Sequence, residues 1–149
     1  MLKLDRNFAY GHLYLSDCYL AQSNYVAAIG EYRTSDLLSG LDPARVAEIY
    51  GALRQAYQTR GEQGCLRKWT ELLLADEALP ADKQMLAEHS TDLAGYYARL
   101  GEKEKALDEL EKRFDEPNVW SQITFLSLYD NLHEEPRFKA LVKRAGLNN

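Results

Sequence analysis

Two cysteines and three histidines are the first candidates in this 149-residue chain for a nucleophile, a general base or a metal ligand. Cys65 directly follows Gly-Glu-Gln-Gly at residues 61–64, near an expected helix start, and such a position can lower the pKa of a thiol. No sequence signature places a base beside it, so a structural or exposed free thiol is the better interpretation. Cys18 lies between the apolar Leu15 and Tyr19 of an expected helix and is predicted to be a small buried side chain.

The histidines form no metal-binding pattern. His133 begins a His-Glu-Glu-Pro segment, which lacks the second histidine of the His-Glu-x-x-His zinc motif. His12 is expected to be partly buried on a helix, and His89, which has acidic neighbours, to lie on the surface. The glycines at 61 and 64 are not followed by the Gly-Lys-Ser/Thr that closes a phosphate-binding loop. We therefore expect no catalytic residue, no cofactor and no metal, and a small enzyme using Cys65 or His133 is the lowest-ranked alternative.

The composition is that of a single globular domain, with 46% hydrophobic and 28% charged residues. The net charge is −5, from 23 acids and 18 bases without a long basic run, which argues against direct nucleic-acid binding. The longest uninterrupted apolar stretch is residues 25–29, far below the roughly 20 residues that span a bilayer. The first residues lack the apolar core of a signal peptide. We expect no membrane insertion and a cytoplasmic location, or an extracytoplasmic one if the chain is attached to a membrane-spanning regulator.

A repeated spacing of apolar and small residues predicts the helices that carry the cysteines and histidines named above. Three stretches each carry Leu, then Tyr four residues later, then a small residue four residues after that, and a fourth position five residues further on. Residues four apart share a helical face, and the small residue suits a turn, so each stretch predicts a helical hairpin. The three sets are Leu15, Tyr19, Ser23 and Ala28; Leu53, Tyr57, Gly61 and Leu66; and Leu93, Tyr97, Gly101 and Ala106.

This pattern resembles the tetratricopeptide repeat (TPR), in which Leu-x-x-x-Tyr is followed by Gly and then Ala. The resemblance covers roughly residues 5–115, with the third copy matching best and the second departing most. It implies an all-α fold, an α-α superhelix or solenoid of three hairpins at about 7–40, 42–77 and 81–115. Residues 118–149 are expected to form a helical cap, which completes one TPR-like domain of residues 1–149, since the ends of a solenoid must be covered.

Both ends of the chain add to the resemblance. Residues 2–9 are similar to a junction between TPR repeats, with Arg6 in place of the usual Pro. The segment containing Pro136-Arg137-Phe138 and Gly146-Leu147 is similar to the closing part of bacterial multidomain signalling and transcriptional regulators that carry a TPR tail. The resemblance implies a fragment of such a protein, acting as a non-enzymatic interaction or regulatory module. Self-association into a homodimer, through Leu2, Leu4, Phe8 and their neighbours, is the alternative.

In TPR proteins the first helix of each hairpin lines a concave groove that binds a protein or peptide segment. Carried over by register, the resemblance gives a groove with few bases, which favours a neutral or basic segment over a terminal carboxylate. The alternative is that these side chains are merely solvated. The expected groove residues are Tyr10, Leu13, Asp17, Leu20, Glu48, Gln55, Gln58, Thr59, Glu88, Thr91 and Arg99.

Overall fold

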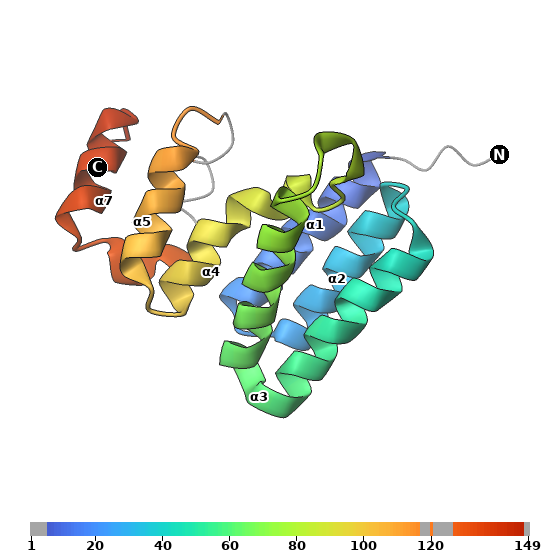
Figure 1. Cartoon of the computed structure of the whole chain (residues 1–149). Coiled ribbons are helices and arrows are strands. Elements are labelled where there is room, and N and C mark those ends of the chain that lie inside the picture. Colours follow the sequence, from blue (N-terminus) through green and yellow to red (C-terminus); the bar gives the residue numbers. More distant parts are fainter. Residues whose placement is uncertain (1–5, 117–119, 121–126, 148–149) are drawn as a thin grey trace. The chain divides into compact units, whose positions relative to one another are not determined.

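The computed structural model describes residues 6–116, 120 and 127–147, and every element assigned in this part of the chain is helical (Figure 1). The all-α prediction is therefore confirmed. The residues fall into two compact units, Met1–Leu72 (unit 1) and Leu73–Asn149 (unit 2), which are described separately. The α-helices are α1 Arg6–Ala21, α2 Tyr25–Leu38, α3 Pro43–Glu77, α4 Leu93–Arg99, α5 Lys103–Lys112 and α7 Pro136–Arg144, and the short 3₁₀ helices are η1 Ala81–Lys83, η2 Ala87–Asp92 and η3 Ser127–Leu132.

The small residues of the repeated pattern turn the chain at the predicted positions. Ser23, Gly61 and Gly101 all have positive φ angles, 59°, 62° and 80°. After Ser23 the Asn24 amide donates to the Tyr19 carbonyl at 2.8 Å, a bond that closes the end of α1. Gly61 lies within α3, which consists of two helical arms, 43–60 and 62–77, and Figure 1 shows the chain doubling back between them.

Local capping explains where several helices begin. The Asn24 side chain accepts from the Ala27 amide at 3.3 Å and caps α2, while Asp42 accepts from the Arg45 amide at 3.0 Å before α3. Pro43 follows this cap at the first helical position, where its missing N–H costs nothing. Pro136 occupies the first turn of α7 in the same way.

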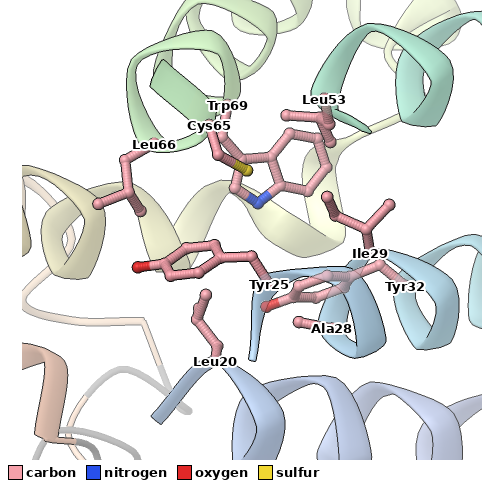
Figure 2. Close-up of a pocket in the computed structure, with 9 residues that line it drawn as sticks. All are labelled: Leu20, Tyr25, Ala28, Ile29, Tyr32, Leu53, Cys65, Leu66 and Trp69. Carbon is pink, nitrogen blue, oxygen red and sulfur yellow. The ribbon is translucent and has the colours of Figure 1, made fainter. Parts of the chain in front are cut away.

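The core of unit 1 is built around Trp69 on the second arm of α3. Its indole meets the rings of Tyr32 and Tyr50 at centroid distances of 5.8 and 5.7 Å. Side chains from α1, α2 and both arms of α3 converge here around a cavity of about 10 Å³, room for about one water (Figure 2). Tyr25 stacks on Tyr57 at 5.6 Å, which ties α2 to the first arm.

Unit 2 packs α4 against η2, η3 and α5. Gly95 makes this packing close, because a Cβ placed there would lie 3.1 Å from Leu128 Cδ1. α7 buries Phe138 and Leu141, as predicted for the cap. The rest of the expected cap falls partly on residues 117–119 and 121–126, which lie outside the described residues.

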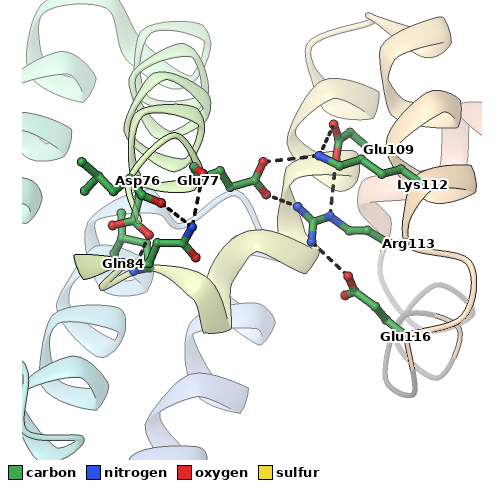
Figure 3. A network of polar contacts seen from close by, with 9 residues as sticks. Asp76, Glu77, Gln84, Glu109, Lys112, Arg113 and Glu116 are labelled. Atoms are coloured by element: carbon green, nitrogen blue, oxygen red, sulfur yellow. Dashed lines mark hydrogen bonds and ion pairs between the residues drawn. The ribbon is translucent and has the colours of Figure 1, made fainter. Parts of the chain in front are cut away.

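A polar network centred on Arg113 joins the end of α3 to the end of α5 within unit 2 (Figure 3). Its guanidinium contacts Glu77, and it also contacts Glu109 at 3.3 Å and Glu116 at 3.2 Å. Burial disfavours the charge, yet the three carboxylates, Glu77 foremost, raise the pKa of Arg113 above its ordinary value. The network therefore favours the charged form of Arg113.

Candidate interaction surface

Helix α1 turns an unusually apolar side to solvent. Phe8, Tyr10, Tyr14 and Leu15 are exposed by 65%, 51%, 66% and 46%. Residues 7–16 contain no Lys, Arg, Asp or Glu, so about 15 Å of the helix between Arg6 and Asp17 carries none of these residues. At 3.6 residues per turn, Phe8 and Leu15 lie on one flank of the exposed half of α1, and Tyr10 and Tyr14 lie on the other flank. Single exposed apolar residues are normal, but several on the exposed half of one helix indicate an interaction site.

Three polar contacts hold α1 against α2 with this side facing outward. The Ser35 hydroxyl donates to the Ala9 carbonyl at 2.9 Å, and the Tyr32 hydroxyl donates to Asp17 at 3.0 Å. His12 and Glu31 pair at 2.5 Å on the half-buried flank. His12 is thus partly buried, as predicted, and its ring lies 5.6 Å from that of Phe8.

The burial of α1 corrects part of the sequence prediction. Leu15 was expected to pack inward and Cys18 to be buried, but both are exposed. Ala9, Ser16 and Leu20 face the core instead. Leu20, an expected groove residue, is only 3% exposed and contributes to the core around Trp69, so a partner cannot reach it.

The remaining expected groove residues of unit 1 are accessible to different degrees. Tyr10 is exposed, whereas Leu13 and Asp17 on α1 are half-buried. On the first arm of α3, Glu48, Gln55, Gln58 and Thr59 are all exposed. Glu48 is paired with Arg45 at 3.0 Å, and the Thr59 hydroxyl donates to the Gln55 carbonyl at 2.9 Å. Among these described groove residues of unit 1, the side-chain amides of Gln55 and Gln58 are the exposed polar groups that no other side chain engages.

Three expected groove residues belong to unit 2. Arg99 is half-buried in the last turn of α4. Glu88 and Thr91 fall in η2, and their side chains lie outside the described part. Because the two units are described separately, the structure does not bring these residues together with those of unit 1.

The two residues of the enzyme alternative, Cys65 and His133, lie in different surroundings. Cys65 is buried, and burial together with the nearby Glu62 carboxylate raises the pKa of its thiol to about 12, opposite to the activation considered from its sequence position. His133 is exposed and stacks on Phe138 at 5.5 Å. His89 is 1% exposed, so the surface prediction for it was wrong. No group of three His, Cys, Asp or Glu side chains that could hold a metal occurs among the described residues.

Comparisons with protein-family models, with curated proteins and with solved structures found no match to this chain. The likeness to TPR proteins therefore rests on the residues quoted above. Among the helices in the described ranges, none has both the length and the apolar character needed to cross a bilayer.

Of the exposed apolar side chains of α1, Phe8 and Tyr10 were predicted from sequence to face a partner, whereas Tyr14 and Leu15 were not. One signal could have found them, namely the absence of charge over residues 7–16 in a chain with 28% charged residues. An amphipathic helix at a protein surface normally carries charge on its outer side. A helix without charge on its outer side is typical of a helix that is buried all round or of one that contacts a binding partner.

Proposed function

We propose that this chain is a non-enzymatic protein-interaction module of TPR-like hairpins that binds a protein or peptide segment against α1. The observation that carries the proposal is the exposure of Phe8, Tyr10, Tyr14 and Leu15 on a helix side without charge. Aromatic side chains dominate binding hot spots, because a ring buries much area at little entropic cost. On the resemblance alone, the proposal extends to a regulatory role within a larger bacterial signalling or transcriptional protein.

The chemistry of the surface indicates the kind of segment. Asp17, the single acid of α1, is half-buried and accepts a hydrogen bond from Tyr32, so the helix presents only one partly covered carboxylate to a basic ligand. The exposed amides of Gln55 and Gln58 can pair with a peptide backbone or with polar side chains. A segment with two or three apolar side chains and little charge fits best.

A peptide selection tests the proposal. A displayed library of random peptides is selected on the whole chain, and the enriched peptides are measured by calorimetry against wild type and the double variant Phe8→Ser, Tyr14→Ser. We expect binding to weaken at least about 30-fold, which corresponds to about 2 kcal/mol for lost hot-spot rings. The melting temperature should remain unchanged, since both rings are exposed.

Val26→Ser is the matched control, because Val26 is a 56% exposed apolar residue on α2. It should leave binding of the selected peptides intact. A selection that enriches no peptide, or peptides that bind the double variant as tightly as wild type, would reject the α1 surface.

Self-association is the second candidate, favoured by the same side of α1 for a specific reason. A surface without charge can meet its own copy without repulsion, and Gly11, next to Phe8, permits close approach because a Cβ there would have no neighbour within 4 Å. Leu2 and Leu4, part of the expected self-association surface, lie outside the described residues. Analytical ultracentrifugation between about 1 and about 100 μM, the range in which weak dimers form, tests self-association. A monomer mass that stays constant over this range would rule it out.

A further inference from the structure

We propose a second binding site, in which Arg33 and Arg54 hold the carboxylate of an acidic partner segment. The two arginines line an open hollow of about 240 Å³ between α2 and the first arm of α3, within unit 1. Ala47, Tyr50 and Gly51 complete the lining. This site is separate from the α1 surface and does not depend on it.

The arrangement of charge distinguishes these two arginines. Both side chains are exposed, and neither guanidinium group donates a hydrogen bond to, or forms an ion pair with, a described residue. Arg45, Arg113 and Arg137, by contrast, are each paired with carboxylates. In a chain of net charge −5, two unpaired guanidinium groups facing one hollow form a local positive site.

Among the described residues, the nearby carboxylates form no ion pair with Arg33 or Arg54. Asp36 is buried and accepts the Tyr50 hydroxyl at 2.5 Å, and Glu48 is paired with Arg45. Residues 47, 50, 51 and 54 recur at three- and four-residue spacing, so they form one stripe of the first arm. Glu48, one residue after Ala47, is turned about 100° around the helix from it and is engaged by Arg45.

The size and lining of the hollow favour the side chain of Glu or Asp over a larger cofactor or a free anion. Ligand sites for nucleotides and other cofactors usually enclose about 300–1,000 Å³, more than is present here. Ala47 and the Tyr50 ring offer apolar surface to the methylene groups of Glu or Asp, while the guanidinium forks match a carboxylate. An inorganic phosphate would gain the charge and the guanidinium hydrogen bonds but no contact with this apolar surface. A Cβ added at Gly51 would meet nothing within 4 Å, so the hollow is open above the helix backbone.

Fluorescence anisotropy with a labelled hexaglutamate peptide, blocked at both ends, tests the site on the whole chain. Arg33→Gln and Arg54→Gln should each weaken binding about tenfold, the loss expected for one charge-assisted pair. Arg60→Gln is the matched control, because it removes the same charge from the same arm but lies outside the hollow, and it should change binding less than about threefold. Binding should weaken with added salt.

Gly51→Leu separates occupation of the hollow from unfolding. Leucine fills the space where the carboxylate would enter, so binding should be lost, while the melting temperature should rise, since Leu favours a helix interior over Gly. Phe8→Ser, Tyr14→Ser should bind hexaglutamate like wild type, which keeps this test independent of the proposed function.

Three outcomes would overturn the proposal. Equal weakening by Arg60→Gln and Arg54→Gln would show diffuse charge attraction instead of a site. Full binding by Gly51→Leu would place the peptide elsewhere. Inorganic phosphate that binds where hexaglutamate does not would show that the hollow takes only a free anion.

Discussion

The turns at Ser23, Gly61 and Gly101 allow a graded stability prediction, because they occupy corresponding positions but different backbone conformations. Ala at Gly101, where φ is 80°, costs about 1–2 kcal/mol for left-handed backbone, less about 0.4–1 kcal/mol gained by restricting the unfolded chain. The net loss is about 1 kcal/mol. Gly61 has φ 62° and ψ −153°, a region open almost only to glycine, so Gly61→Ala should cost about 2 kcal/mol.

Ser23→Gly should act in the opposite direction. Ser23 is the one described non-glycine residue with positive φ, and removing its Cβ should raise the free energy of unfolding by about 0.5–1 kcal/mol. Steric clash does not confuse the series, since a Cβ at Gly61 or Gly101 meets nothing within 4 Å. Gly30→Ala is the control, because Gly30 lies inside α2 with equally free space and should gain about 0.5–1 kcal/mol.

Urea unfolding followed by circular dichroism measures all four variants. Ser23, Gly30 and Gly61 belong to unit 1, so their comparison is made on one transition. The prediction is contradicted if Gly61→Ala lowers the free energy of unfolding no more than Gly101→Ala does, or if Gly30→Ala lowers it as much as either. In that case φ would not control the turns, and the repeated small residues would have another cause.

Three further predictions concern single contacts. Arg113→Met should lower the free energy of unfolding of unit 2 by about 2 kcal/mol in urea, because the surrounding carboxylates lose their cation; a loss below about 0.5 kcal/mol would mean that solvent screens them. The Cys65 pKa is about 12 when folded against a reference of 9.0, so between pH 9 and 12 the unfolded chain binds fewer protons and stability falls, by up to about 1.4 kcal/mol per pH unit. Cys65→Ala should remove that component, and an unchanged slope from pH 8 to 11 would contradict it. Gly64→Ala should cost about 1–3 kcal/mol in urea unfolding, because its Cβ would lie 2.8 Å from the Ala56 carbonyl oxygen. Gly51→Ala, inside the same helix but with free space, should instead gain about 0.5–1 kcal/mol.

The turns were predictable from sequence because positive φ restricts residue type. Gly61 and Gly101 mark such positions directly, and Ser23 could be placed only through the repeat. Asp42-Pro43 was predictable for the same kind of local reason, since capping involves only neighbouring residues. The stacking of the hairpins into a superhelix depends on contacts between units and stays a prediction.

The inward side of α1 was not predictable from spacing. Leu15 and Tyr19 have the right separation for a buried face, but apolar residues occur all around this helix, so periodicity has no polar side with which to contrast. The polar contacts of Ser35 and Tyr32 from α2 decide which side is buried.

Contacts distant in sequence overrode two other local interpretations. Asp108 and Lys112 have the four-residue spacing of a helical ion pair, yet Asp108 pairs with Arg137 of α7 at 2.9 Å. Cys65 follows a turn that suits an activated thiol, but Trp69 and the core around it enclose the sulfur, and burial outweighs the helix start. Candidate sites chosen by local spacing fail where tertiary packing supplies the environment.

The Trp69 ring lies 5.8 Å from the Tyr32 ring and 5.7 Å from the Tyr50 ring, and this proximity provides an intrinsic fluorescence probe of unit 1. Light absorbed by Tyr32 or Tyr50 should pass to the indole by resonance transfer while α2 and both arms of α3 stay assembled. Loosening of unit 1 would restore tyrosine emission, so a ligand that tightens or opens this unit can be followed without any attached dye.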